Sequence, residues 1–384
     1  MPQHSQRMSF LSSITRCWPL SVLFREDRIK TSDLNDFPCL KTLPGCGFTL
    51  LSDVLIEPHA TGLLDATGLA IRESFLRRGK GSWRRDSRRR IEDAGLSRIP
   101  TDTVIFIPII WFSHFGHFLT ETAAWLSPLL DPDIDLLGKA GPSARIVVGA
   151  GWEPELPALC RLLSLPPDRV VSTQSLPGVL VCRRVFLPWP TMVNRSGIHP
   201  DHFMAVRRLV DRWYGLDGFA FREPLSRLSG ADVPLVPQEK VYLSRSALPR
   251  RYRHMLGEKR LERRLWANGW TIVHPEKMTL ERQLAVLASA RVLAGMAGSG
   301  FHLLMYAGQA AAGRRMIVLD RHEAAQSLNY ALQCRAQGVD FRCVRCLARF
   351  PFRQRKARKK VNQDAVFAAS PARIAAVLDV LAGA

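Results

Sequence analysis

The chain has 384 residues, of which 47% are hydrophobic, and this length suits two α/β domains better than a single core. It carries 54 Lys and Arg against 34 Asp and Glu, and the net charge of +20 indicates an anionic partner: nucleic acid, an acidic membrane surface or phosphorylated substrates. No apolar run approaches the roughly 18 residues of a membrane span, so no transmembrane helix is predicted.

Two features bear on the compartment. The segment from Met1 to Leu23 lacks the continuous apolar core and the cleavage site of a signal peptide. The eight cysteines are scattered and few for a disulfide framework in a chain of this length. We therefore expect a cytoplasmic protein.

Much of the positive charge lies in two runs, 77–90 with eight Lys or Arg and 353–360 with six. Neither run is interleaved with the aromatic residues of a base-stacking platform, so both are interpreted as exposed segments. Peripheral contact with the anionic inner face of the membrane is one role that they would suit. The first run is predicted to be a linker at the end of a poorly defined N-terminal extension, residues 1–98, with short candidate strands at 48–51 and 54–56.

A buried strand is predicted over Thr103 to Ile110, and a helix follows it from about His114. On that helix His114, His117 and Glu121 share one face at spacings i, i+3 and i+7. Two histidines and a carboxylate at this spacing could bind zinc, act as an acid–base pair, or fill a polar notch in a buried helix. The i, i+3 histidine spacing differs from the i, i+4 spacing of the familiar zinc helix, which weakens the metal interpretation.

Further strands and helices follow up to residue 220, and we expect residues 99–220 to form one Rossmann-like domain. Within it, an amphipathic helix is predicted over Asp201 to Tyr214 with Asp201 as its N-cap. His199 and His202 flank that position, and a turn with a helix cap is favoured over a metal pair. The Gly- and Pro-rich stretch 217–237 is predicted to be the linker to a second Rossmann-like domain, residues 236–350, with a basic run and a C-terminal helix over 351–384.

The second half alternates strands and helices from Lys240 to Glu323, with strands predicted at 240–243, 270–273, 292–295 and 316–319. This alternation predicts a parallel, doubly wound sheet. In such a sheet the carboxyl ends of the strands lie on one edge, where open α/β folds bind ligands. Polar and glycine-rich segments follow three of the predicted strands. These segments are Ser244-Arg245, Gly298-Ser299-Gly300 with His302, and Asp320-Arg321 with His322-Glu323.

The glycine-rich segment lies between a predicted strand, Val292 to Gly295, and an apolar helix that begins at Phe301. Strand, glycine turn and helix direct free backbone N–H groups toward an anion, and glycine lets a phosphate approach without a Cβ in the way. Taken alone, the pattern also describes tight turns that bind nothing. Together with Arg245 for a diphosphate and polar side chains for ribose or sugar hydroxyls, it suits a sugar nucleotide.

Three segments resemble family 61 of the glycosyltransferases, a family of capsular and surface polysaccharide enzymes. The first is His114 to Glu121. The second is Tyr242-Leu243-Ser244-Arg245, followed by Arg251 and Glu258. The third runs from Leu280 through Gln283 and the glycine loop to His302. The chain departs from the family pattern at Ala297, where members often have histidine, and at Gly257 and Arg282, where they often have Asn and Glu.

The resemblance implies a GT-B fold, in which two Rossmann-like domains with parallel sheets face a cleft. The C-terminal half would bind a nucleotide-sugar through Ser244, Arg245, Gly298, Ser299, Gly300, His302, Asp320 and Arg321. The N-terminal half would bind a glycan or lipid-linked acceptor. The leaving diphosphate would be stabilised by a helix N-terminus and cations, so neither a metal nor another cofactor is expected.

A transferase of this kind needs a base for the acceptor hydroxyl, and His117 and Glu121 are the candidates. The sequence does not choose between them. Two other classes of protein stay open: a zinc-dependent hydrolase built on His114, His117 and Glu121, and a basic nucleic-acid-binding protein supported by charge alone. We expect no specific binding of nucleic acid, because no recognised binding module is present.

Overall fold

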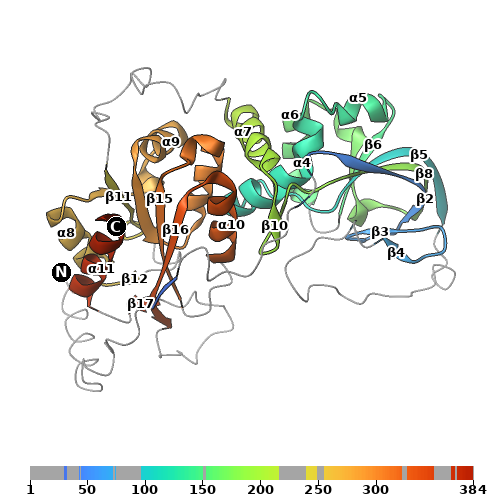
Figure 1. The fold of residues 1–384 in the computed structure, drawn as a ribbon. Coiled ribbons are helices and arrows are strands. Elements are labelled where there is room, and N and C mark those ends of the chain that lie inside the picture. The colour runs from blue at the N-terminus through green and yellow to red at the C-terminus, as the bar shows by residue number, and fades with distance from the viewer. Residues whose placement is uncertain are drawn as a thin grey trace, which may run out of the picture.

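The computed structural model describes residues 30–32, 43, 45–71, 74, 97–149, 153–215, 239–248, 255–321, 327–349, 365–367 and 370–383. Its helices and strands form two α/β halves that lie side by side, each built around one large sheet (Figure 1). Both basic runs and the predicted 217–237 linker lie outside the described residues.

The first half contains a seven-stranded sheet of order β4-β3-β2-β8-β5-β6-β7. Its strands are β2 (Phe48–Ile56), β3 (Leu63–Leu64), β4 (Ala70–Ile71), β5 (Arg98–Ile107), β6 (Arg145–Val148), β7 (Val170–Ser172) and β8 (Val179–Pro188). The last four strands in chain order pair in parallel, with β5 between β8 and β6. The strand order therefore reverses between β5 and β8, which is a topological switch point.

This sheet is mixed rather than wholly parallel, because β2, β3 and β4 join it in antiparallel pairs. The two short apolar pieces predicted at 48–51 and 54–56 form the single strand β2, which pairs along its length with β8. The first sheet thus includes residues that the sequence analysis placed in an N-terminal extension ending at 98. An apolar run shows that a segment is a strand but not which distant strand it will pair with.

The second half contains an eight-stranded sheet in which β13-β11-β14-β15-β16 are parallel. These strands are β11 (Lys240–Leu243), β13 (Thr271–Val273), β14 (Val292–Met296), β15 (Arg315–Arg321) and β16 (Asp340–Arg349). In chain order this is the doubly wound arrangement 2-1-3-4-5, with its switch point between β11 and β14. Beyond β16, the short strands β1 (Lys30–Ser32) and β17 (Ala365–Phe367) pair antiparallel with it, and β12 (Met255–Leu256) pairs with β17.

Helices cover both faces of the second sheet. Buried side chains of α8 (Glu258–Ala267) and α11 (Pro371–Gly383) share one apolar cluster with Tyr242 and Ile317 of the sheet. The other face is covered by α9 (Leu280–Ser289), η11 (Ser299–Ala311) and α10 (Ser327–Gln337). The sequence explains several helix ends: Thr279 caps α9 by accepting from Arg282 N, and Gly269 follows α8 at a positive φ of 77°.

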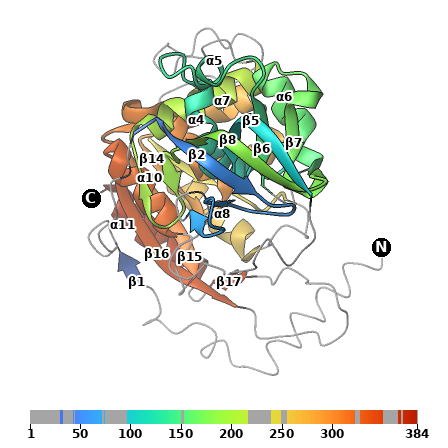
Figure 2. The ribbon, with the colours of Figure 1, turned by 90° about the vertical axis from the view of Figure 1, so that its right-hand side faces the viewer.

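One continuous core joins the two halves. The helix α7 (Asp201–Tyr214) lies between them (Figure 1), and its Phe203 side chain is buried. Gly308 of η11 packs against this helix, since a Cβ on the glycine would lie 3.5 Å from Phe203 Cβ. Tyr306 Oη donates to Asp211 Oδ1 at 2.5 Å across the same boundary. Figure 2 shows the first sheet in front of the second half, along the line that joins them. The two halves are therefore held by buried contacts as well as by the chain connection.

Candidate active site

The histidine segment follows β5 at the switch point of the first sheet. His114 precedes the short helix α3 (Phe115–His117), which continues through a π-helical turn, η5 (Phe118–Thr122), into α4 (Ala123–Leu130). The helix predicted from about His114 is present, but its second turn is widened. Such π-helical turns are frequent at functional sites.

His117 and Glu121 form a pair of one partly exposed and one buried side chain. The distance from His117 Nδ1 to Glu121 Oε2 is 2.8 Å, and the side chains are 31% and 4% exposed. The ring N–H does not align with the oxygen as in a well-formed hydrogen bond, so the contact is best described as an ion-pair contact. Behind it, Asn194 Nδ2 donates to Glu121 Oε1 at 2.9 Å.

The loop in front of His117 is held by its neighbours. Glu155 accepts from Phe112 N at 2.9 Å and from Ser113 Oγ at 2.5 Å. The His117 ring lies between two other rings, with centroid distances of 4.5 Å to His114 and 5.3 Å to Trp111. These contacts fix the ring's position while leaving about one third of the side chain accessible.

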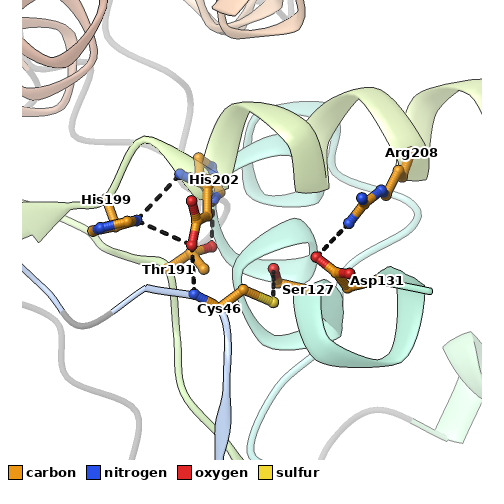
Figure 3. Close-up of polar contacts among 8 residues, drawn as sticks. Cys46, Ser127, Asp131, Thr191, His199, His202 and Arg208 are labelled. Carbon is orange, nitrogen blue, oxygen red and sulfur yellow. Dashed lines mark hydrogen bonds and ion pairs between the residues drawn. The ribbon is translucent and has the colours of Figure 1, made fainter. Parts of the chain in front are cut away.

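A buried histidine supports the widened turn from below. His202 Nε2 lies 3.0 Å from Leu119 O. Its Nδ1 lies 3.0 Å from Thr191 Oγ1 (Figure 3). The carbonyl can only accept, so Nε2 carries the proton and Nδ1 accepts from the hydroxyl. Burial lowers the pKa of His202 to about 3, which keeps the ring neutral.

The contacts of His199 and His202 are those of a turn before a helix rather than those of a metal pair. Asp201 is the first residue of α7 rather than its N-cap, and its carboxylate accepts from Cys46 N at 2.7 Å. His199 Nδ1 lies 3.3 Å from that carboxylate (Figure 3), whereas His202 turns into the core. The segment is a turn that ties the chain before β2 to α7.

The glycine loop follows β14 at the switch point of the second sheet. Gly298 is the N-cap of η11, and Ser299 and Gly300 are its first residues, so their N–H groups have no acceptor within the helix itself. The N-terminus of a helix carries partial positive charge and attracts anions. An added Cβ on Gly300 would meet no atom within 4 Å, so open space adjoins the loop there.

Arg245 lies beside this loop, as the shared sheet edge predicts. Its Nη1 donates to Ala297 O at 3.1 Å, and a Cβ on Gly298 would come within 3.1 Å of the same nitrogen. The pairing of β11 with β14 in parallel brings the two segments together, because both strands end at the same edge.

Ser244 supports the loop from within rather than facing the open space. It is 1% exposed, its Oγ donates to Glu262 Oε1 at 2.5 Å and accepts from Ser246 N at 3.0 Å. Glu258, also 1% exposed, accepts from Arg245 N at 3.0 Å. Burial, with the nearby Glu262 charge, raises the pKa of Glu258 to about 7, although the hydrogen bond from Arg245 N acts in the opposite direction.

His302 lies in the first turns of η11, close to the first half. Its Nδ1 is 2.8 Å from Gln333 Oε1, and its ring stacks on Tyr330 at a centroid distance of 4.8 Å. Gln333 Nε2 donates to Phe301 O, so Oε1 is the amide's acceptor and His302 Nδ1 carries the proton. Burial, with a smaller effect of the nearby His117, lowers the pKa of His302 to about 4.

The last predicted pair stands at the end of β15. Asp320 is 6% exposed and lies opposite Arg345 of β16, just before a bulge in the ladder. Arg321 is the final residue of the strand, and His322 and Glu323 lie outside the described residues. The roles of Asp320 and Arg321 as donor contacts stay predictions.

A cavity adjoins the glycine loop on the side of β13. It is small and partly open to solvent, and its lining is mostly apolar: Leu243, Val273, Pro275, Gln283, Val286, Leu287, Gly300 and Leu303. Gln283 Nε2 donates to Pro275 O at 3.0 Å and to Met278 O at 3.3 Å, which shapes the wall after β13. The cavity opens at the same sheet edge as Arg245.

The two switch points face each other. A Cβ on Gly116 would lie 3.2 Å from Ser299 Cβ, so the turn that carries His117 touches the glycine loop. The hairpin of β9 (Met192–Val193) and β10 (Gly197–Ile198) also crosses over, since Arg195 N donates to Asn329 Oδ1 of α10 at 2.7 Å. The His117–Glu121 pair and the glycine loop thus form one composite site.

A model of the glycosyltransferase 61 family matches residues 115–317, more than half of the chain. The chain belongs to glycosyltransferase family 61. The match begins at Phe115 beside the histidine pair and ends inside β15, so it includes the turn of the first half and the glycine loop of the second. A search of curated proteins found no match.

Membership in family 61 confirms the resemblance and supports a glycosyltransferase activity. It gives no support to a zinc hydrolase or to a nucleic-acid-binding protein. Among the described residues, no group of three or more His, Cys, Asp or Glu side chains is arranged to hold a metal ion. No helix in the described part of the chain is both long enough and apolar enough to cross a membrane.

Several supporting residues of this glycosyltransferase site escaped the sequence analysis. Asn194 and Glu155 contact the histidine segment from loops that carry no recognisable motif. Tyr330 and Gln333 share one face of α10 at i, i+3, and Tyr330 Oη donates to Gly298 O at 3.1 Å. The i, i+3 spacing is the only sequence signal that could have predicted a role for Tyr330 and Gln333, and the same spacing occurs on any ordinary helix face.

Proposed function

We propose that this family 61 enzyme transfers a sugar from a nucleotide-sugar to a hydroxyl of a glycan acceptor, in a GT-B arrangement of two Rossmann-like halves. The donor binds at the carboxyl edge of the second sheet, and the acceptor binds against the first. The observation that carries this proposal is the contact between the turn of His117 and the glycine loop, where Gly116 lies against Ser299.

The diphosphate would bind at the N-terminus of η11. The N–H groups that begin this helix, together with the guanidinium of Arg245, favour a group with several anionic oxygens. The same contacts strengthen as charge develops on the leaving diphosphate, which is the electrostatic help that a transferase needs.

His117 is the better candidate for the base, and Glu121 for its positioning partner. Glu121 is nearly buried and its oxygens contact His117 and Asn194, so an acceptor hydroxyl would meet His117 first. The Glu121 carboxylate beside Nδ1 favours the tautomer with its proton on that nitrogen, and Nε2 then has the lone pair that removes the acceptor proton. The carboxylate also stabilises the imidazolium that forms.

His302 would take part as a neutral hydrogen-bonding group. Its fixed Nδ1 proton leaves the Nε2 lone pair to accept from a hydroxyl, and its depressed pKa keeps it uncharged near neutrality. A neutral ring beside His117 also avoids a second positive charge when His117 becomes protonated.

The experiment that tests the donor assignment is a thermal-shift screen of nucleoside diphosphates, their sugars and the free nucleosides. A ligand that binds only the folded state raises the melting temperature by mass action. The proposal expects stabilisation by at least one diphosphate and none by inorganic sulfate at the same ionic strength. No shift with any nucleotide, at concentrations up to about 1 mM, would contradict the proposal for a donor of ordinary affinity.

A further inference from the structure

The outer face of the second half, away from the first sheet, is unusually basic. Four cations of α8 are exposed: Lys259, Arg260, Arg263 and Arg264. Their spacing places them on the side of the helix opposite Leu261 and Leu265, which are fully buried against the sheet. Within the described part of the chain, none of the four forms an ion pair.

The carboxylates of the same helix point elsewhere. Glu258 is buried beneath Arg245, and Glu262 accepts from Ser244 at 2.5 Å. The outward side of α8 therefore presents positive charge without the interspersed acids of an ordinary solvated helix.

Two large apolar side chains are exposed on this same layer. Trp266 of α8 is 73% exposed, and Val380 of α11 is 70% exposed. The two helices pack on one face of the second sheet, at the end of the molecule farthest from the first sheet (Figure 1). Tryptophan with clustered Lys and Arg is the side-chain combination that settles at the boundary between lipid headgroups and acyl chains.

We propose that the outer face of α8 and α11, the α8–α11 face, docks on the surface of an anionic membrane. The cations contact lipid phosphates while Trp266 and Val380 enter the headgroup layer. This proposal is independent of the proposed donor and acceptor chemistry. A membrane is favoured over nucleic acid because the face is an exposed layer of two helices with one tryptophan, not a groove lined by several stacking aromatics.

The direction from which an acceptor reaches the enzyme follows from this docking together with the proposed function of His117. With the α8–α11 face on the membrane, the sheet lies between the lipid and η11, and the first half points away from the surface (Figure 1). An acceptor that meets His117 in this orientation approaches from the aqueous side. A soluble glycan chain or the distal end of a long anchored glycan fits this geometry better than a sugar next to its lipid.

The test is co-sedimentation of the full chain with vesicles of phosphatidylcholine alone, or with about one third phosphatidylglycerol. The wild type is expected to bind the anionic vesicles and not the neutral ones. Each cation near such a surface contributes roughly fivefold in affinity, so the double variant Arg263→Glu/Arg264→Glu should lose at least about tenfold. Trp266→Ala should weaken binding to the anionic vesicles without changing net charge.

The matched control is Arg145→Glu/Arg183→Glu, which changes the same net charge at exposed arginines of the first sheet. It should bind vesicles like the wild type, and both basic runs remain intact in every variant. Equal losses in the two double variants would show a general charge effect and overturn the proposal. If the Arg263/Arg264 pair fails to fold, as judged by circular dichroism, Lys259→Glu/Arg260→Glu carries the same comparison.

Two further measurements distinguish other occupants. Loss of DNA binding in Arg263→Glu/Arg264→Glu with unchanged vesicle binding would make the face a nucleic-acid surface and overturn the proposal. A change from oligomer to monomer in Trp266→Ala, measured by light scattering without lipid, would make it a contact with a second copy and overturn it equally. Unchanged DNA binding and oligomeric state, with weaker vesicle binding, supports the membrane.

Discussion

Gly116 lies against Ser299, so closely that a Cβ on the glycine would come within 3.2 Å of the serine Cβ. This contact joins the turn that carries His117 to the glycine loop. The missing side chain is what lets the two halves of the site approach each other. The φ of Gly116 is not in the left-handed region, so the backbone conformation does not require glycine here. The requirement comes from the close contact with Ser299.

The contact predicts the effect of Gly116→Val. A branched side chain would push α3 from η11, and a misplacement of about 1 Å can cost on the order of 100-fold in rate. We expect turnover to fall by roughly 10- to 100-fold with donor affinity nearly unchanged, because the donor loop lies wholly in the second half. Steady-state kinetics and donor calorimetry measure both quantities, and unchanged turnover would contradict this role of the contact.

His117→Ala should lower turnover by about 10²–10⁴-fold, the usual loss when a general base is removed. Donor affinity should stay near the wild-type value, since the proton moves only in the transition state. Glu121→Gln keeps the shape but removes the charge behind the ring, so its loss should be smaller. His199→Ala, which removes a partly exposed imidazole paired with Asp201, is the matched control and should keep normal rates. Normal transfer in His117→Ala would remove this residue from the mechanism.

Arg245→Ala should weaken binding of a nucleoside diphosphate but not of the free nucleoside. A charge-assisted hydrogen bond typically contributes about 1.5–3 kcal/mol, which corresponds to roughly 10- to 150-fold in affinity. Because Arg245 also binds Ala297 O, Arg245→Lys is measured beside it: a rescue by lysine would point to charge, and no rescue would point to the shape of the loop. Equal diphosphate affinity in wild type and Arg245→Ala would refute the assignment.

Gly300→Val tests whether the space beside the loop holds the donor. An added Cβ on Gly300 meets no protein atom within 4 Å, so the melting temperature without ligand should change little. Donor binding should be lost if the phosphates or the base occupy that space. Gly298→Val is a less clean test, since its Cβ would press on Arg245 Nη1 at 3.1 Å. Normal donor calorimetry in Gly300→Val would make the loop only a turn.

The raised pKa of Glu258 predicts that the free energy of unfolding falls as the pH rises. Burial raises its pKa from 4.5 to about 7, so folding takes up a proton between these values. Its contribution to stability is complete below about pH 4.5 and is lost as the pH rises through 7. The Glu258→Gln side chain cannot lose a proton. Between about pH 5 and 8, the free energy of unfolding of the wild type should therefore fall by roughly 3 kcal/mol relative to that of the variant. Denaturant unfolding of both proteins across this range measures the difference, and a constant difference would show that the carboxyl is already ionised.

The local elements of the second half, and the chemistry of their side chains, could be predicted from the sequence. Alternating apolar runs and helix signals placed β11, β13, β14 and β15 within a few residues of where the structure has them. Glycines after Met296 marked the loop, and parallel alternation implied that Arg245 would share its edge, which the β11–β14 pairing confirms. The histidine segment after β5 was likewise visible as a cluster of chemically capable side chains.

What each of these side chains contacts depends on the three-dimensional fold and could not be predicted. Ser244 and Glu121 look equally available in the sequence, yet both are nearly buried against partners 18 and 73 residues away. The addition of β2–β4 to the first sheet depends on pairing across more than a hundred residues. Periodicity reports how a segment buries its own apolar face, whereas strand partners, burial of single polar groups and the contact of Gly116 with Ser299 depend on distant parts of the chain.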